Sequence, residues 1–515
     1  MKSLRIDVYS HHLLLTQYTE SAQVAIKRYI RTILAQYERI NKGYGHVEMK
    51  LVDIYASYSK ERLEYRLHRN CLDDFVEYLG NYRLHASDIE IIHHHIEPGV
   101  FVDFRIREDF KPYDYQSDAL ENYLNKPEPI AKLLTFQTGF GKTLTAQASM
   151  THWKTRTLAV LKPMFIEKWI SDFKKDLGLA TKDIVVVQGS KALAGLIQQA
   201  QDGELDKKVI ILSNRTVYFY IHDYKNLPRF DFDDKYGCVP QDLLKVLGVG
   251  LRLIDETHME YHGNFMLDLF THVQCSIDMS ATLDHDDAFM KRMYMLRFPM
   301  TQRYSAMDYS KYVDVYALRY WFNQESLNKI RFIRRGRQSY SHSDFEKSLM
   351  RCRKILDRYV KMVLEIIETQ YFKDREEGQK MLVFAASVNL CTYLRDAIQK
   401  AYPNLKIGRY VSEDSFDVLT DNDIIVSTLL SSGTAVDIAG LRTVLMTTAV
   451  RSLQQNVQAL GRLRKLRGKW ENVPLRFMYF VSENIQAHLD YHEAKRRMFK
   501  YRCGSFNEIH MRTQI

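Results

Sequence analysis

Short apolar runs alternate with longer amphipathic stretches along most of this 515-residue chain. In the first half, six such runs indicate buried strands, at residues 132–136, 157–161, 184–187, 209–212, 251–254 and 275–279. A second series indicates five more, at residues 380–385, 407–410, 423–427, 443–447 and 477–481. Because strands separated by helix-length segments form parallel sheets with crossover helices, each series predicts an α/β lobe.

The first hundred residues follow a different pattern. Strand-like runs and helical stretches alternate there, the strands at residues 4–9, 47–58, 89–93 and 100–106 and the helices near 21–40 and 70–82. The last of these strand-like runs alternates apolar and polar residues, as a half-buried strand does. We expect a small α+β module in front of the two lobes.

The chain is too long for one hydrophobic core, since cores stop growing near ~250–300 residues. We expect an N-terminal α+β module over 1–105, a first lobe over 106–300, a basic helical connector over 301–370 and a second lobe over 371–515.

Positive charge is unevenly distributed. The chain carries a net charge of +10, but residues 1–100 are balanced, with 13 Lys and Arg against 13 Asp and Glu. Residues 303–375 hold 16 against 9, and residues 451–515 hold 13 against 5. Basic regions of this kind can grip a polyanion by releasing its counterions, although solvated basic helices are also common.

The compartment and the membrane relation follow from composition. The six cysteines form no CxxC pair, so neither a zinc ribbon nor a disulfide framework is indicated. Apolar runs stay short of the ~20 residues that span a bilayer, and the first residues lack a secretory signal. We expect a monomer in a reducing cytoplasm, the host cytoplasm if the chain is phage-encoded, with no membrane partner.

The first chemical motif is a phosphate loop, Thr138-Gly139-Phe140-Gly141-Lys142-Thr143, between a predicted strand and a predicted helix. Its glycines permit close backbone approach, so that amide groups at the helix N-terminus can surround phosphate. Lys142 would neutralise the β- and γ-phosphates, and the Thr143 hydroxyl would bind magnesium. The pattern departs at its first position, where Phe136 replaces the usual Gly or Ala.

The second motif is Asp255-Glu256-Thr257-His258, directly after a predicted strand. Two adjacent carboxylates then lie at the carboxyl edge of a sheet, where α/β proteins bind ligands. Asp255 would hold magnesium, and Glu256 would orient and deprotonate the attacking water. The alternative is an acidic N-cap of the next helix, but this alternative does not explain why a phosphate loop lies upstream.

In these residues the chain resembles the superfamily 2 helicases and translocases, whose motif II varies around DExH. Ser280-Ala281-Thr282 matches motif III and implies that Ser280 and Thr282, with His258, couple the nucleotide site to nucleic acid. Tyr113-Asp114-Tyr115-Gln116 resembles the segment that reads adenine, with Gln116 as the reader and Tyr113 in the usual Arg position. Gln can pair with the N6/N7 edge of adenine.

The second half of the chain resembles the remaining motifs. Asp437 lies in a motif V-like segment, where Ala435 replaces a common glycine, and would approach the ribose or the other lobe. Gln458-Ala-Leu-Gly-Arg462-Leu-Arg464-Lys465 resembles motif VI, with Gln458 as a coupling residue. The resemblance implies that Arg462 contacts the γ-phosphate. Lys465 falls where a second arginine is usual, and we expect Arg464 to act there because lysine lacks the planar guanidinium fork.

The resemblance implies two RecA-like lobes, ATP and Mg²⁺ as ligands, and nucleic-acid-dependent ATP hydrolysis. The layout is most similar to the phage UvsW-type recombination helicases, which implies unwinding, annealing or branch migration on branched or forked DNA, with duplex binding by the N-terminal module. Three alternatives stay open: a restriction-type duplex translocase that does not separate strands, a nucleic-acid-binding scaffold with a weak ATPase, and an RNA helicase. Polarity and preferred substrate are not encoded in any motif.

Three further groups of residues could have a functional role or an ordinary structural one. Arg334, Arg335 and Arg337 in the connector can grip nucleic-acid phosphates or form a solvated hinge face. His488 and His492 have the i, i+4 spacing of a zinc pair without a third ligand. The aromatic stretch Tyr218-Phe219-Tyr220 is expected to be mostly core material.

Overall fold

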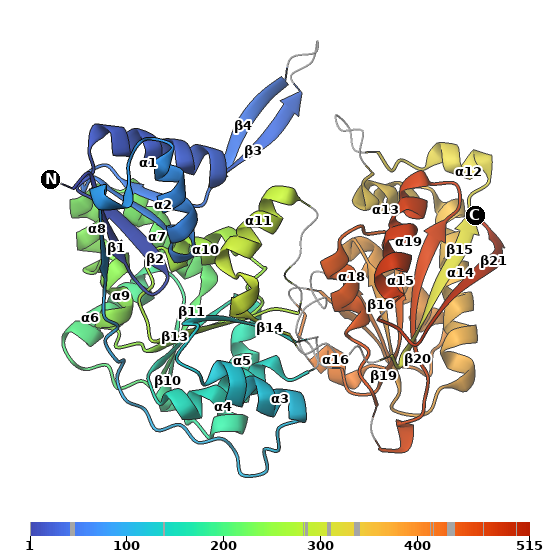
Figure 1. Ribbon diagram of the computed structural model, residues 1–515. Coiled ribbons are helices and arrows are strands. Elements are labelled where there is room, and N and C mark those ends of the chain that lie inside the picture. The colour runs from blue at the N-terminus through green and yellow to red at the C-terminus, as the bar shows by residue number, and fades with distance from the viewer. Residues whose placement is uncertain are drawn as a thin grey trace. The chain divides into compact units, whose positions relative to one another are not determined.

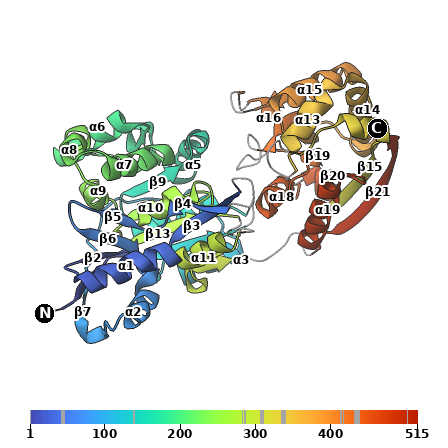
Figure 2. The same ribbon diagram turned by 90° about the horizontal axis from the view of Figure 1, so that it is seen from above.

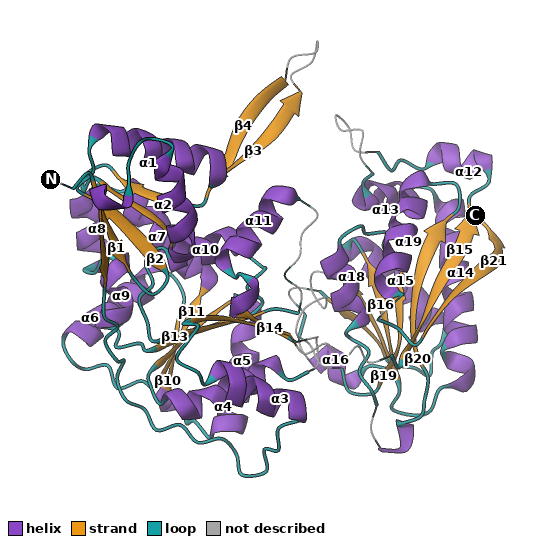
Figure 3. Ribbon diagram, viewed as in Figure 1, coloured by secondary structure: helices purple, strands orange, loops and turns teal. Residues whose placement is uncertain are grey.

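The computed structural model describes residues 2–41, 47–136, 140–281, 283, 287–305, 311–333, 340–411, 414–415, 417–429, 438–466, 468–500 and 502–515. The chain forms two compact units, Met1–Ala306 and Met307–Ile515. Figure 1 shows the elements in chain order, and Figure 3 shows that strands and helices alternate in both units.

The N-terminal module has a five-stranded sheet in the order β5-β6-β2-β1-β7. Its strands are β1 (Leu4–Val8), β2 (His12–Thr16), β5 (Ser57–Ser59), β6 (Glu64–His68) and β7 (Ile89–His93). Its helices are α1 (Glu20–Ile33) and α2 (Leu72–Gly80), while β3 (Ala35–Asn41) and β4 (Val47–Ile54) pair as a separate ribbon that projects from the module (Figure 1). The α+β module is as expected.

Two details of the module differ from the sequence expectation. Residues 100–106 form no strand but an extended segment on the edge of the first lobe, where Val102 and Phe104 are buried. Phe101 makes an isolated antiparallel bridge to Thr155, so the alternation reflects packing of every second side chain beside a single bridge. The predicted helix over 21–40 ends at Ile33, and β3 begins two residues later.

The first lobe is a seven-stranded, all-parallel sheet in the order β10-β11-β9-β12-β13-β8-β14. The strands are β8 (Ala131–Thr135), β9 (Thr157–Leu161), β10 (Ile184–Val187), β11 (Val209–Ser213), β12 (Leu251–Ile254), β13 (Cys275–Met279) and β14 (Arg303–Ser305). The helices are α3 (Asp114–Ala119), α4 (Lys142–Trp153), α5 (Ile166–Leu177), α6 (Ser190–Gln201), α7 (Asn214–Asn226), α8 (Arg229–Tyr236), α9 (Pro240–Val246), α10 (Tyr261–Asp268) and α11 (Ala288–Arg297). The six predicted strands are present within one residue at each end.

The second unit is another seven-stranded, all-parallel sheet, in the order β17-β18-β16-β19-β20-β15-β21. The strands are β15 (Val313–Trp321), β16 (Lys380–Ala385), β17 (Ile407–Tyr410), β18 (Ile424–Thr428), β19 (Leu441–Met446), β20 (Leu475–Ser482) and β21 (Ser505–Gln514). The helices are α12 (Gln324–Lys329), α13 (His342–Arg351), α14 (Arg353–Gln370), α15 (Val388–Ala401), α16 (Asp417–Asp421), α18 (Leu453–Leu460) and α19 (Gln486–Phe499). Helices α13, α14 and α15 cover one face of this sheet, and α18 and α19 the other (Figure 2).

The expected basic connector over 301–370 is corrected by these elements. Val313–Trp321 is a strand between β20 and β21, and α14 is a core helix of the second unit. Its basic residues lie on the exposed side of an amphipathic helix, which is why charge counting suggested a linker.

The N-terminal module and the first lobe share one hydrophobic core, which runs from Leu4 to Tyr294. Buried polar contacts join them as well. The His11 imidazole Nε2 lies 2.6 Å from the Ser276 hydroxyl, and His68 Nε2 lies 3.6 Å from the Asp268 carboxylate. The module is therefore built into the first unit.

Asp268 belongs to a buried network of two arginines and two aspartates. Arg297 Nε donates to Asp268 at 2.5 Å and its Nη2 lies 2.8 Å from Asp278, while Arg252 Nη2 lies 2.6 Å from Asp268. Although burial alone raises the pKa of Asp268, the charges of Arg297 and Arg252 hold that pKa well below its usual value. The network fixes α10 and α11 against the ends of β12 and β13.

We predict that Arg297→Ala lowers the free energy of unfolding by about 3–5 kcal/mol, because it leaves two buried carboxylates without their main partner. Urea unfolding followed by circular dichroism measures this. The matched control is Arg229→Ala, whose exposed i, i+4 pair with Asp233 should contribute about 0.3–0.5 kcal/mol. Equal losses in the two variants would contradict the prediction.

Candidate functional site

Three neighbouring parallel strands of the first lobe bring the predicted motifs together. In the sheet, β13 lies between β8 and β12. Lys142 follows β8 after the phosphate loop, Asp255 and Glu256 follow β12, and Ser280 follows β13. Because the strands are parallel, these residues meet at one edge of the sheet.

Lys142 is the first residue of α4 and is buried. Its ammonium donates to the Phe136 carbonyl at 3.2 Å and lies 3.9 Å from the Glu256 carboxylate Oε1. Gly141 before it has φ +72°, and a Cβ there would lie 2.6 Å from the Gln116 side-chain nitrogen. Glycine is thus required at the end of the loop for both backbone angle and space. Thr143 is the second residue of α4, and Thr138 and Gly139 lie outside the described residues.

Phe136, which departs from the usual loop pattern, has a packing reason. Its ring is fully buried, with edge-to-face contacts to Tyr115 at 5.3 Å and Tyr304 at 6.1 Å between ring centroids. The large side chain points into the lobe and fills the space between α3 and β14. The departure therefore changes the support of the phosphate loop and adds no side chain to the phosphate cradle.

Gln116 is buried against the same loop. Its side-chain nitrogen donates to Thr145 Oγ1 at 3.1 Å and to the Phe140 carbonyl at 3.4 Å, and its oxygen accepts from the Tyr113 amide at 3.0 Å. The residue predicted to read adenine thus joins the start of α3 to the end of the phosphate loop. Its role toward adenine stays a prediction.

Asp255 and Glu256 form the acidic part of the site. The Trp169 indole donates to Asp255 Oδ2 at 2.9 Å, and the Glu256 amide donates to Asp255 Oδ1 at 2.9 Å. Burial, and after it the charge of Glu256, raises the pKa of Asp255. Glu256 has φ +47°, a left-handed conformation that is costly for a non-glycine residue and is found most often at functional sites.

The third and fourth residues of the motif are tied to neighbouring elements. Thr257 donates to Asp278 Oδ2 at 2.6 Å and accepts from Arg297 at 2.7 Å, so the buried ion network holds the backbone beside Glu256. His258 Nδ1 lies 2.8 Å from the Ser280 hydroxyl and 3.4 Å from Glu256. Burial and the Lys142 charge lower the pKa of His258 to about 3, so the imidazole is neutral. The segments that resemble motifs II and III are in direct contact through His258 and Ser280, whereas Thr282 lies outside the described residues.

The residues fit a magnesium–triphosphate. A buried lysine lies at the N-terminus of α4, where a helix favours anions. Asp255 is the carboxylate that can hold a hard cation. Glu256 Oε2 is buried and accepts no hydrogen bond from the described residues, although His258 Nδ1 lies 3.4 Å from it, and it is therefore placed to receive a water molecule. If Glu256 had only a structural role, a buried carboxylate oxygen without a hydrogen bond would destabilise the fold.

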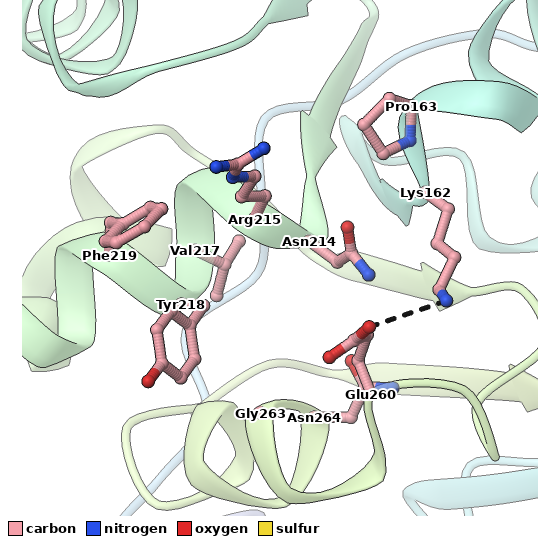
Figure 4. A pocket seen from close by; sticks show the side chains of 10 residues that line it. All are labelled: Lys162, Pro163, Asn214, Arg215, Val217, Tyr218, Phe219, Glu260, Gly263 and Asn264. Carbon is pink, nitrogen blue, oxygen red and sulfur yellow. Dashed lines mark ion pairs between the residues drawn. The ribbon is translucent and has the colours of Figure 1, made fainter.

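A pocket of about 430 Å³ at the same edge of the sheet was not predicted from the sequence. Lys162 and Asn214 line it at the ends of β9 and β11, and Arg215, Tyr218 and Phe219 project from α7 (Figure 4). Lys162 is 3.5 Å from Glu260. Of the three aromatic residues expected to be mostly core, Tyr220 is buried, whereas Tyr218 and Phe219 are 49% and 45% exposed, which corrects that expectation. In the sequence, this part of the pocket could have been found from the i, i+3, i+4 spacing of Arg215, Tyr218 and Phe219, which places them on one helix face.

The second unit carries the residues that resemble motif VI, in and directly after the end of α18. Gln458 and Arg462 are buried, Arg464 is half-buried, and Lys465 is exposed with its ammonium 3.0 Å from Glu471. That ion pair occupies Lys465 within its own unit. The remaining candidates of this part lie outside the described residues, namely Asp437, Arg334, Arg335 and Arg337.

The histidine candidates have ordinary partners. His488 lies 2.6 Å from the Tyr340 hydroxyl and accepts from the Ser482 amide, and His492 lies 2.8 Å from the Tyr479 hydroxyl. Within the described part of the chain, no group of three or more His, Cys, Asp or Glu is placed to hold a metal ion. None of the helices in that part combines the length and apolar character needed to cross a bilayer.

Comparison with solved structures places the fold. The structure of Mss116p (NTE and C-tail double deletion) bound to ssRNA and AMP-PNP is similar with a TM-score of 0.50 and 13% identity, over 77% of this chain and 74% of that one. The chain therefore has a two-lobed RecA-like fold similar to that structure, with a small α+β module in front of the lobes, as the sequence predicted. The crystal structure of T4 UvsW aligns over 99% of this chain and 100% of that one, with 12% identity and a TM-score of 0.33. No protein-family model and no curated protein matches the chain.

We predict that Trp169→Phe moves the pH dependence of Mg²⁺–nucleotide binding to higher pH. The indole bond stabilises the charged form of Asp255, and its loss raises an already raised pKa further. A magnesium ligand must be deprotonated, so affinity should rise with pH and reach its plateau later in the variant. Calorimetric titration with Mg²⁺–AMP-PNP across pH measures this.

The control for that experiment is Trp153→Phe, which loses a bond to the Leu124 carbonyl away from the carboxylates. Its profile should match the wild type. Superimposable profiles for all three proteins would contradict the assignment of Asp255 as the magnesium ligand.

Proposed function

We propose that the protein is a nucleic-acid-dependent ATPase that translocates on or unwinds DNA, with branched or forked DNA as its substrate class. The observation that carries the proposal is the meeting of Lys142, Asp255 and Glu256 at the carboxyl edge of the first-lobe sheet, where Lys142 lies 3.9 Å from Glu256. Their residue types match the requirements of phosphoryl transfer, which are charge neutralisation, a metal ligand and a base. The helicase-like fold, and the AMP-PNP and ssRNA bound by the similar Mss116p structure, are consistent with it.

Each residue then has one role. Lys142 binds the β- and γ-phosphates, and amide groups at the start of α4 add donors. Asp255 holds the magnesium, which supplies charge neutralisation at the phosphates when bound. Glu256 orients the attacking water and accepts its proton through Oε2, the oxygen that has no hydrogen-bond donor among the described residues. His258 is neutral and couples Glu256 to Ser280, because its Nδ1 lies 2.8 Å from the Ser280 hydroxyl.

The pocket of Figure 4 is the proposed site where a nucleic-acid strand crosses the first lobe. Lys162 and Arg215 supply positive charge, and exposed Tyr218 and Phe219 supply ring faces for bases. Ser280 and the pocket both lie at the carboxyl ends of the same sheet, so nucleotide chemistry and strand binding share one edge.

We predict that Glu256→Gln lowers the nucleic-acid-stimulated ATPase rate by about 10²–10⁴-fold, because the amide cannot accept the proton. Lys142→Ala should abolish nucleotide binding. Phosphate release measured with single-stranded DNA, duplex DNA, a fork, a Holliday junction and structured RNA tests activity and substrate together. Lys154→Ala, at the other end of α4, is the control and should keep full activity.

Two results would contradict parts of the proposal. Undiminished hydrolysis in Glu256→Gln would sink the enzyme assignment. A stronger stimulation by structured RNA than by any DNA would make the chain an RNA helicase. Strand displacement on forks, beside triplex displacement on plain duplex, separates unwinding from duplex translocation.

We propose that Arg462 and Arg464 provide the arginine contacts to the γ-phosphate and that Lys465 does not, since Lys465 is paired with Glu471. Arginine fingers contribute about 10³–10⁵-fold to such rates. Arg462→Ala and Arg464→Ala should each lower the turnover number strongly with little change in nucleotide affinity, whereas Lys465→Ala should have a small effect. Single-turnover hydrolysis ranks the three variants by their loss of rate. If Lys465→Ala shows the largest loss, the assignment is reversed.

A further inference from the structure

A second groove lies in the first unit, where the N-terminal module meets the end of α7. Two adjoining hollows of about 360 and 480 Å³ share Ser57, Tyr58 and Lys225 among their lining residues. One wall comes from α1 and the β5–β6 region of the module, and the other from the last turn of α7. We call these two hollows the seam groove.

Three positive charges of the seam groove lack acidic partners among the described residues. Among the described residues, no carboxylate lies within ion-pair distance of Arg31, Lys60 or Lys225, which all line it. Lys225 is exposed at the end of α7, so its ammonium is open to an anionic partner. Of the two acids on the wall, Glu64 is already paired with Arg66 at 3.1 Å. The groove thus carries excess positive charge.

The zero net charge of residues 1–100 hides a separation of charges. Helix α1 carries Lys27, Arg28 and Arg31 against Glu20, whereas α2 carries Asp73, Asp74 and Glu77 without a basic residue. Lys27 and Arg31 of α1 line the seam groove. A module that is neutral as a whole therefore presents a basic helix at this position.

Aromatic rings lie between these charges. Tyr58 is 41% exposed, and its ring stacks on Tyr65 with a centroid distance of 4.4 Å and an interplanar angle of 26°. Tyr224 lines the same groove, with the Arg62 guanidinium 5.8 Å above its ring. A supported, half-exposed ring in a basic groove is the arrangement on which nucleic-acid bases stack.

Helix α7 links the seam groove to the pocket of Figure 4. Arg215 stacks over Phe219 at 5.7 Å and Tyr218 stacks on His222 at 6.0 Å, both at i, i+4 spacing. Lys225 follows on the same helix. From Arg215 to Lys225 the helix rises about 15 Å. A row of rings and cations therefore runs from one hollow to the other.

We propose that the seam groove binds single-stranded nucleic acid, as a continuation of the strand held in the pocket of the first lobe. The proposal rests on the proposed function and adds a binding site to it. Arg31, Lys60 and Lys225 contact phosphates, and Tyr58 stacks a base. Recessed rings favour a single strand over a duplex, because in a duplex the base faces are already stacked.

The test compares a triple charge reversal, Arg31→Glu/Lys60→Glu/Lys225→Glu, with Lys182→Glu, an exposed lysine beside β10. Fluorescence anisotropy gives the affinity for a long oligothymidylate and for a duplex of equal length over a range of salt. For the single strand, the slope of log affinity against log salt should fall by about 0.7 for each phosphate that the variant no longer neutralises. Tyr58→Ala should lower the affinity for the single strand roughly tenfold and leave the slope of log affinity against log salt unchanged. Lys182→Glu should match the wild type, and thermal unfolding verifies that each variant is folded.

The outcomes separate the two proposals. If nucleic acid stimulates the wild-type ATPase but the triple variant keeps the wild-type slope, the seam groove is not a binding site and the proposed function stands. If only duplex affinity falls, the groove holds a duplex and the single-strand proposal is overturned. If the wild type neither binds nucleic acid nor is stimulated by it, both proposals fail.

Discussion

Four buried charges, Arg252, Arg297, Asp268 and Asp278, hold the geometry of the first unit. They join β12, β13, α10 and α11, and Arg297 also donates to Thr257 beside Glu256. Buried charges are tolerated only when they are paired and hydrogen-bonded, so these elements cannot shift independently. The left-handed backbone at Glu256 is retained because its neighbour is fixed in this way.

The same network extends to the N-terminal module through His68 and Asp268. The module packs on the first lobe through a shared apolar core and through buried imidazoles, and its basic helix thereby reaches the end of α7. The proposed strand path along α7 depends on this docking, since neither the module nor the lobe forms the seam groove alone.

Much of the fold was predictable because parallel strands are buried on both faces and read as continuous apolar runs. The six predicted strands of the first lobe are all present for that reason. The prediction of elements and core residues failed where a segment is buried on one face and exposed on the other. Residues 100–106 alternate like a strand but form an isolated bridge, from Phe101 to Thr155. Strand β15 was missed because exposed basic residues around it suggested a linker. Tyr218 and Phe219 are chemically indistinguishable from core residues in sequence, and only the helix phase exposes them.

The sequence by itself determined the residue types of the proposed nucleotide site, Lys142, Asp255 and Glu256, because phosphoryl transfer restricts both type and order along the chain. It also determined the two α/β lobes. Only the tertiary structure decided that Phe136 supports the loop from within the core, that Lys465 is paired with Glu471, and that a neutral module presents a basic groove. The reason is physical: strand ends converge by a general rule of parallel sheets, whereas the partners of a side chain depend on packing between segments far apart in the chain.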